Sequence, residues 1–328
     1  MKTRRLGKTG FNIGEISLGT WQVGGKWGSG FDDSLAESIL ETAIDEGVNF
    51  IDTADVYEDG KSEAAVGRVV RRRSERVYVA TKCGRFIDPH VSEGYTPEIL
   101  RTYVENSLKN TGLDVLDLVQ IHCPPTPVYY RPEIFELFDR LKDEGKILNL
   151  GVSVEKVEEA LKAIEYPNVN TVQIIFNMFR QRPADLFFAE AAKKDIGIII
   201  RVPLASGLLT GRFTRDTSFA PEDHRTFNRD GAAFDKGETF AGIPFDTGLD
   251  AVNEIKKIFP DQKNLAPVAL RWILDHPEVS TIIPGASKLE HLKSNLSSAE
   301  LPQLSEQSRR KVDEIYTERI KTLVHHLW

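Results

Sequence analysis

Eight short apolar runs recur along the 328-residue chain, and segments with helical periodicity separate most of them. The predicted strands are residues 15–19, 48–51, 77–81, 116–121, 147–152, 171–175, 197–201 and 281–283. The predicted helices are residues 34–46, 63–70, 132–144, 154–164, 184–194, 288–297 and one that opens at Thr96-Pro97. This alternation predicts a parallel α/β sheet. The count and length fit a closed (β/α)8 TIM barrel, with residues 1–328 as a single domain. A doubly wound sheet is the alternative.

Three segments fall outside this alternation. Residues 3–14 predict an N-terminal β-hairpin with Gly10 in its turn, and residues 305–319 predict an appended helix. Residues 212–248 form a long irregular insert after the seventh strand, and inserts of this length are often functional. At the C-terminus, His325, His326 and Trp328 could either seal a pocket or fray, and we expect them to fray.

Composition excludes several classes of partner. Lys and Arg total 42 against 49 Asp and Glu, a net charge of −7, which argues against nucleic acid. The two cysteines, Cys83 and Cys123, have no C-x-x-C spacing, so we expect neither a disulfide framework nor a metal site. They suit a reducing, cytoplasmic location. We find no signal peptide and no apolar stretch long enough to cross a membrane.

Ionisable side chains stand at or just beyond three successive strand ends. Asp52, Lys82 and His122 end the second, third and fourth strands, and Tyr57 follows Asp52 in the next loop. In a barrel the carboxyl ends of the strands meet on one face, so the four side chains would share one pocket. Taken singly, each residue is better explained by a structural role, for example an Asp52–Lys82 ion pair. Taken together, the four residues at successive strand ends favour an active site.

The four side chains suit proton transfer to an oxygen. A free tyrosine has a pKa of about 10, and a lysine ammonium at ~4 Å would stabilise the Tyr57 phenolate by about 4 kcal/mol at most. Burial of the phenolate acts in the opposite direction. Asp52 would keep the buried Lys82 charged, and His122 could donate a hydrogen bond to a carbonyl oxygen. The set predicts protonation of an alkoxide as it forms.

The blocks FIDTADVY (50–57), VATKCG (79–84) and QIHCPP (120–125) resemble the catalytic blocks of the aldo-keto reductase superfamily. The resemblance runs from SLGTWQVGG (17–25) to IIPGASKLEHLKSNL (282–296) and includes the branch of bacterial reductases and potassium-channel β-subunits. It implies a (β/α)8 barrel that uses NADPH without a Rossmann fold. It also implies Tyr57 as general acid, Lys82 and Asp52 as groups that tune it, and His122 as the group that orients the carbonyl.

The cofactor site is predicted at the loops after the seventh and eighth strands, because no G-x-G-x-x-G follows a strand. A helix N-terminus there favours an anion, and Lys288 adds charge for a 2′-phosphate. The resemblance implies contacts from Gly19, Thr20, Trp21, Ser153, Gln173, Arg201, Val202, Pro203, Leu204, Ser206, Gly207, Arg212, Arg225, Gly285, Ser287, Lys288, His291 and Asn295. The length and composition of the insert, residues 212–248, predict a lid that folds over the pyrophosphate of the cofactor.

Four positions depart from the family pattern. Val154, His291 and Ser294 replace residues that commonly contact the cofactor, and Arg201 stands where an aromatic side chain commonly stacks on the nicotinamide. We predict a preference for NADP(H) over NAD(H). The residues at these four positions affect how strict that preference is.

We expect an NADPH-dependent reductase of aldehydes or ketones, with Trp21, Trp27 and Phe86 lining an apolar mouth. One alternative is a Schiff-base lyase with Lys82 as nucleophile, although Asp52 would suppress the free amine. The other is a cofactor-sensing auxiliary subunit with slow turnover. The sequence gives no oligomeric state.

Overall fold

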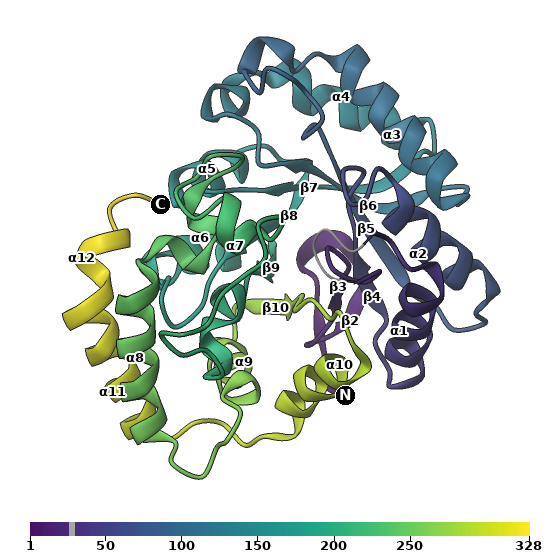
Figure 1. Ribbon diagram of the computed structural model, residues 1–328. Helices are drawn as coiled ribbons and strands as arrows, with labels where there is room; N and C mark the ends of the chain where they lie inside the picture. Colours follow the sequence, from purple (N-terminus) through teal and green to yellow (C-terminus); the bar gives the residue numbers. More distant parts are fainter. Residues whose placement is uncertain (26–29) are drawn as a thin grey trace.

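Eight parallel strands form one continuous ring in the computed structural model, which describes residues 1–25 and 30–328 (Figure 1). The strands are β3 (Leu18–Gly19), β4 (Phe50–Asp52), β5 (Tyr78–Cys83), β6 (Leu116–His122), β7 (Ile147–Ser153), β8 (Val169–Ile175), β9 (Gly197–Arg201) and β10 (Val279–Ile282). Each pairs with the next in chain order, and parallel bridges Ile16–Ile282 and Gly19–Gly285 join the two edges. The barrel prediction is confirmed, and the doubly wound alternative is wrong.

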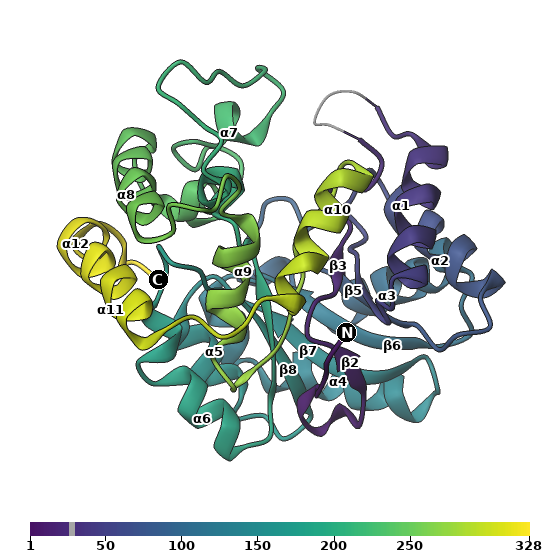
Figure 2. The same ribbon diagram turned by 90° about the horizontal axis from the view of Figure 1, so that it is seen from below.

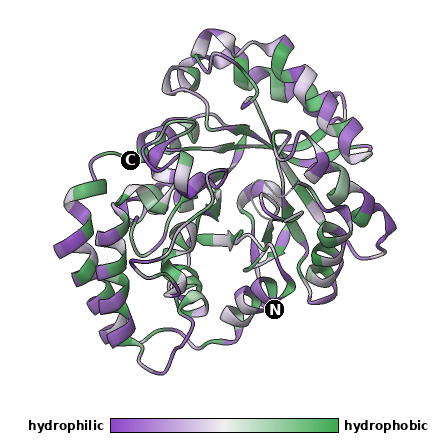
Figure 3. Ribbon diagram, in the orientation of Figure 1, coloured by the Kyte–Doolittle hydropathy of each residue, from purple (hydrophilic) through white to green (hydrophobic). Residues whose placement is uncertain are grey.

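The helices surround the ring. They are α1 (Asp33–Asp45), α2 (Lys61–Arg72), α3 (Pro97–Thr111), α4 (Pro132–Asp143), α5 (Val157–Ala163), α6 (Phe187–Lys193), α7 (His224–Phe227), α8 (Phe245–Ile258), α9 (Ala266–Leu274), α10 (Leu289–Leu296), α11 (Glu306–Ile315) and α12 (Lys321–Val324). Figure 3 shows hydrophilic and hydrophobic residues on different sides of the outer helices, as expected for helices that cover a sheet. No helix of the described chain is both long and apolar enough to span a membrane.

Two predicted helix starts need correction. Helix α5 begins at Val157 and not at residue 154, because the Glu159 carboxylate accepts hydrogen bonds from the Glu155 and Lys156 backbone N–H groups. Helix α6 begins at Phe187, after a 3-10 turn that contains Pro183. Helices α8 and α9 were not predicted, and α8 includes the last residues of the segment expected to be irregular.

The barrel interior is layered by the two-residue period of the strands. Phe50, Ala80, Leu118 and Ile199 belong to one buried apolar cluster inside the ring. Two residues further along the same strands, on the same face, stand Asp52, Lys82, Gln120 and Arg201. An apolar layer therefore supports a polar layer directly below the carboxyl ends of the strands.

The two ends of the barrel are covered differently. The predicted hairpin is present as β1 (Thr3–Arg5) and β2 (Asn12–Gly14), and Gly10 adopts a φ of 80° in its connection. The hairpin lies at the end opposite α7 and the insert that contains it (Figure 2). Leu6 is fully buried there, and the Lys8 N–H donates to the Asp195 carbonyl at 2.8 Å. The other end of the barrel is the one covered by the insert.

The C-terminus is ordered against the barrel, so the expectation that it frays is wrong for Trp328. This side chain is 6% exposed, and the Arg180 guanidinium lies 3.9 Å from its ring centroid. The Tyr316 hydroxyl also hydrogen-bonds the His325 ring at 2.8 Å. The appended helix is confirmed as α11 and continues into α12.

A buried carboxyl group in the loop after β4 was not singled out in the sequence. Asp55 is 4% exposed, and burial, with the Glu63 carboxylate as the next contribution, raises its pKa to about 8. The folded protein therefore keeps Asp55 protonated across a range where the unfolded chain, with a pKa near 3.8, is ionised. The contribution of Asp55 to stability is present below pH 3.8 and is lost as the pH rises toward 8.

We therefore expect the free energy of unfolding to fall between pH 5 and pH 8, and Asp55→Asn to reduce that fall by at most about 4 kcal/mol. The measurement is the thermal midpoint of both proteins across this range. Asp59→Asn, an exposed position in the same loop, is the matched control. Parallel pH profiles for the wild type and Asp55→Asn would contradict the assignment.

Candidate active site

Lys82 links two of the other predicted catalytic residues, Asp52 and Tyr57, from inside the barrel. Its Nζ donates hydrogen bonds to Asp52 Oδ1 at 2.5 Å, to the Thr53 carbonyl at 2.8 Å and to Tyr57 Oη at 3.2 Å. The side chains of Lys82 and Asp52 are 1% and 2% exposed. The predicted convergence of Asp52, Tyr57 and Lys82 at the barrel mouth is therefore seen in the structure.

The second oxygen of Asp52 is also bound. Gln120 Nε2 and Gln173 Nε2 donate to Asp52 Oδ2 at 2.9 and 2.8 Å. Sequence reasoning missed Gln120, although it precedes His122 by two residues and so lies on the same face of β6. These contacts fix the carboxylate, and the carboxylate in turn fixes Lys82.

The charges of this group follow from burial and pairing. Burial lowers the pKa of Lys82, but Asp52 and Tyr57 outweigh it, and the net pKa is raised, so the ammonium stays charged. Burial raises the pKa of Tyr57, and the opposing effect of Lys82 is smaller. The expected depression of the tyrosine pKa is thus outweighed by desolvation. Tyr57 is a neutral phenol whose oxygen accepts from Lys82, which leaves its own proton available for donation into the cavity.

His122 faces Tyr57 across the mouth. The two ring centroids lie 6.1 Å apart at an interplanar angle of 82°. Burial, then the positive charges of Lys82, Arg85 and Arg201, holds the pKa of His122 well below its usual value. A neutral imidazole carries one N–H donor and cannot act as a strong acid. His122 Nδ1 has no hydrogen-bond partner within the described part of the chain.

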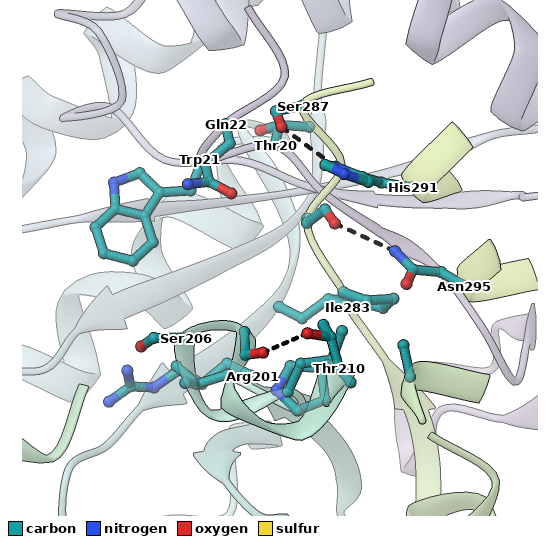
Figure 4. A pocket seen from close by; sticks show the side chains of 18 of the residues that line it. Thr20, Trp21, Gln22, Arg201, Ser206, Thr210, Ile283, Ser287, His291 and Asn295 are labelled. Carbon is teal, nitrogen blue, oxygen red and sulfur yellow. Dashed lines mark hydrogen bonds between the residues drawn. The ribbon is translucent and has the colours of Figure 1, made fainter. Parts of the chain in front are cut away.

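A cavity of about 490 Å³ extends from these residues along the mouth. Asp52, Tyr57 and His122 line it at one end, while Lys82 lies behind Tyr57. All predicted cofactor contacts except Ser153 line the same cavity. Ser153 is fully buried at the end of β7, with its Oγ 3.5 Å from Cys123 Sγ. In Figure 4, Trp21 and Arg201 lie toward one side, and His291 and Asn295 toward the other.

The far part of the cavity has the features of a phosphate-binding cradle. The loop after β9 turns sharply, with positive φ at Val202, Ala205, Ser206 and Gly207. A Cβ added at Gly285 would come no closer than 3.9 Å to any other residue, so it would project into space that a ligand can use. Arg212, Lys288 and the start of α10 supply positive charge at the same end. These residues fit an anionic nicotinamide cofactor.

The atypical positions make contacts of their own. Arg201 Nη2 donates to the Val154 carbonyl at 3.0 Å, and Nη1 lies 3.3 Å from Glu238 Oε2. The His291 ring is 3.3 Å from Ser287 Oγ, and Ser294 Oγ accepts from Asn264 at 2.7 Å. Neighbouring residues of the protein therefore hold the side chains of Arg201, His291 and Ser294 in place.

The insert contributes residues that the sequence did not identify. Asp223, His224 and Glu238 line the cavity, and no spacing rule connects them to the strand ends. The Trp21 indole packs on the His224 ring, with centroids 5.2 Å apart. Trp21 therefore forms a wall of the cavity, as predicted.

Phe86 and Trp27 are the other two aromatic residues predicted to line the mouth of the cavity. Phe86 is 45% exposed and lies near Tyr103, with ring centroids 6.2 Å apart, so its predicted place at the mouth is wrong. Trp27 lies outside the described residues.

Comparisons with known proteins identify the family of the chain. Residues 15–317 match the model of the Aldo/keto reductase family. Aldo-keto reductase YhdN of Bacillus subtilis is 31% identical over 303 residues, which cover 90% of this chain and 87% of that protein. A putative voltage-gated potassium channel subunit beta of Schizosaccharomyces pombe is 29% identical over 336 residues, which cover 95% and 92%.

A solved structure has the same fold over nearly the whole chain. The glycerol dehydrogenase AKR11B4 from Gluconobacter oxydans superposes with a TM-score of 0.77 at 30% identity, covering 97% of this chain and 96% of that one. The family match and the fold of this solved structure agree. The chain therefore belongs to the Aldo/keto reductase family of oxidoreductases.

Proposed function

We propose that the protein reduces aldehyde or ketone carbonyls to alcohols with NADPH. The observation that carries the proposal is the hydrogen bond from the charged Lys82 to Tyr57 Oη at the wall of a cavity that reaches a basic cradle. A phenol held in this way is a proton donor at the place where a carbonyl oxygen would enter. The buried, reduced cysteines agree with the cytoplasmic location that belongs to this proposal.

The chain's own residues account for the proton that the reaction needs. The bound cofactor would supply a hydride to the carbonyl carbon. Tyr57 Oη would give its proton to the carbonyl oxygen, and the Lys82 ammonium would stabilise the phenolate that remains. His122, neutral and beside Tyr57, would donate a hydrogen bond that orients the oxygen. Asp52 balances the charge of Lys82, so the site holds its geometry throughout.

The cradle supports the preference for NADPH. Lys288, Ser287 and Arg212 line the cavity at the start of α10, where a 2′-phosphate would add negative charge. A Lys–phosphate pair at this exposed position favours the phosphorylated cofactor without excluding NADH.

The structure weakens the Schiff-base alternative. Lys82 is almost completely buried and donates to three oxygens, and its raised pKa keeps the amine protonated. A nucleophilic amine needs the opposite conditions. The auxiliary-subunit alternative draws on the name of the fission-yeast relative, whereas the intact group of Tyr57, Lys82 and His122 favours catalysis.

Tyr57→Phe removes the proton donor and leaves the ring that packs near Trp21 and His122. We expect kcat for carbonyl reduction to fall about 10²- to 10⁴-fold while the Kd for NADPH stays within threefold. Stopped-flow turnover and titration of NADPH fluorescence measure the two quantities. Equal turnover in both proteins would contradict the assigned role.

Lys288→Ala removes the cation assigned to the 2′-phosphate. We expect the Kd for NADPH to rise about tenfold and the Kd for NADH to change less than twofold. Lys293→Ala, an exposed lysine on the same helix outside the cavity, is the matched control. An equal loss of affinity for both cofactors would contradict a contact to the 2′-phosphate.

A further inference from the structure

The side chain of Trp328 contacts both the barrel and the insert. The Arg180 guanidinium, in the loop after β8, lies 3.9 Å from the centroid of its ring. Two glycines bring the backbone of the insert against the same ring. A Cβ added at Gly237 would lie 2.9 Å from Trp328 Cε2, and one added at Gly242 would lie 2.5 Å from Trp328 Cη2. A larger residue at either position would therefore force the insert away from the indole.

The chain around Trp328 is anchored to the loop between β8 and α6. The Arg182 guanidinium donates a hydrogen bond to the Trp328 carbonyl oxygen at 2.7 Å. His325 Nε2 lies 3.0 Å from Asp185 Oδ2, and His325 Nδ1 hydrogen-bonds the Tyr316 hydroxyl at 2.8 Å. The indole is thus fixed to the barrel independently of the insert.

Arg180 makes this contact depend on an aromatic ring. The residue is 3% exposed, and its Nη1 and Nη2 have no hydrogen-bond partner among the described residues. Burial lowers the pKa of Arg180 to about 9, and the negative charge of Asp235 in the insert is the largest effect in the opposite direction. A buried cation is costly, and the face of the Trp328 indole offsets part of that cost. Removing the ring would break its contacts with both the guanidinium and the insert.

Residues 237–242 of the insert carry part of the cavity lining. Glu238 lines the cavity, and its carboxylate lies 3.3 Å from Arg201 Nη1. Ser206 Oγ, from the loop after β9, donates a hydrogen bond to the Glu238 carbonyl at 3.0 Å. The barrel and Trp328 therefore hold the same short segment of the insert.

Asn228 extends this support to α7. Its side chain is fully buried, and its Nδ2 donates a hydrogen bond to Thr239 Oγ1 at 3.2 Å. Its Oδ1 accepts a hydrogen bond from the Phe234 N–H at 2.9 Å. Helix α7 ends directly before Asn228 and begins with His224, which lines the cavity. A shift of residues 237–242 would therefore also shift α7.

We propose that Trp328 is a positioning residue that holds the insert at the cavity and thereby slows release of the nicotinamide cofactor. The inference rests on the proposed function and adds the element that controls how long the cofactor stays bound. The insert supplies Asp223, His224 and Glu238 to the cavity wall, so a bound cofactor leaves more slowly when that wall stays in place. Trp328 is not among the described residues that line the cavity, so it acts through the insert.

The first test measures the rate of NADPH release. The loaded protein is mixed with excess NADP⁺ in a stopped-flow instrument, and the loss of bound NADPH fluorescence is followed. Trp328→Ala should raise the rate constant for release about tenfold or more. Leu327→Ala removes an apolar side chain that is 44% exposed in the same tail, and should keep the rate constant within twofold. If Trp328→Ala does not fold, Trp328→Leu, which keeps an apolar side chain without the ring, takes its place.

Hydrogen exchange gives a readout that needs no cofactor. In the cofactor-free Trp328→Ala variant, the backbone amides of residues 224–242 should exchange at least fivefold faster than in the wild type. The amides of β5 and β6 should keep their exchange rates, because these strands lie in the barrel wall away from the tail. Leu327→Ala should leave both groups of amides unchanged.

Gly242→Ala tests the contact from the side of the insert. Apart from the Trp328 ring, nothing that the structure describes lies closer than 3.5 Å to the added Cβ, although the φ of 82° also disfavours alanine. The substitution should speed NADPH release in the wild type and add little in the Trp328→Ala background. Equal effects in the two backgrounds would mean that the backbone conformation alone is responsible, and would contradict the contact.

Two further results would overturn the inference. Unchanged NADPH release and unchanged exchange in Trp328→Ala would do so while leaving the proposed function intact. Faster exchange throughout the chain would assign Trp328 to overall stability and would also overturn it. If neither NADPH nor NADH binds to the wild type, the proposed function fails and the control of release fails with it, whereas the exchange rates still decide whether Trp328 holds the insert.

Discussion

The buried ion pair between Asp52 and Lys82 is the interaction on which the rest of the site depends. Two charges removed from water are costly unless every remaining lone pair and proton is satisfied. Gln120 and Gln173 complete the carboxylate, and the Thr53 carbonyl and Tyr57 Oη complete the ammonium. The network keeps both charges and holds Tyr57 in one position. A lysine that is fixed and charged suits the stabilisation of a phenolate and does not suit nucleophilic attack.

The barrel makes this network possible through the period of its strands. Residues two positions apart point to the same side, so an apolar layer with Phe50 and Ala80 lies under a polar layer with Asp52 and Lys82. The apolar layer excludes water from below. The same burial that strengthens the ion pair raises the pKa of Tyr57, so Tyr57 is a neutral phenol in this site, as the proposed role of proton donor requires.

The insert after β9 changes the character of the cavity. It places Glu238 against Arg201 and packs His224 against Trp21 with their rings tilted, which adds charge and an aromatic wall to a mouth built otherwise from strand ends. Ser206 ties the insert to the barrel, because its Oγ donates to the Glu238 carbonyl at 3.0 Å and accepts from the Phe240 N–H at 3.1 Å. This part of the cavity wall is therefore assembled from two segments, the strand ends and the insert, with separate structural constraints.

The sequence by itself determined the barrel, the hairpin and the three strand-end residues, because hydrophobic period and position on a strand are local properties that parallel topology brings to one face. Only the tertiary structure decided the Arg201–Glu238 pair and the buried Trp328, since these depend on contacts between residues far apart in the chain. It also decided the direction of the pKa of Tyr57, because the balance between burial and the charge of Lys82 depends on the packing of the whole mouth.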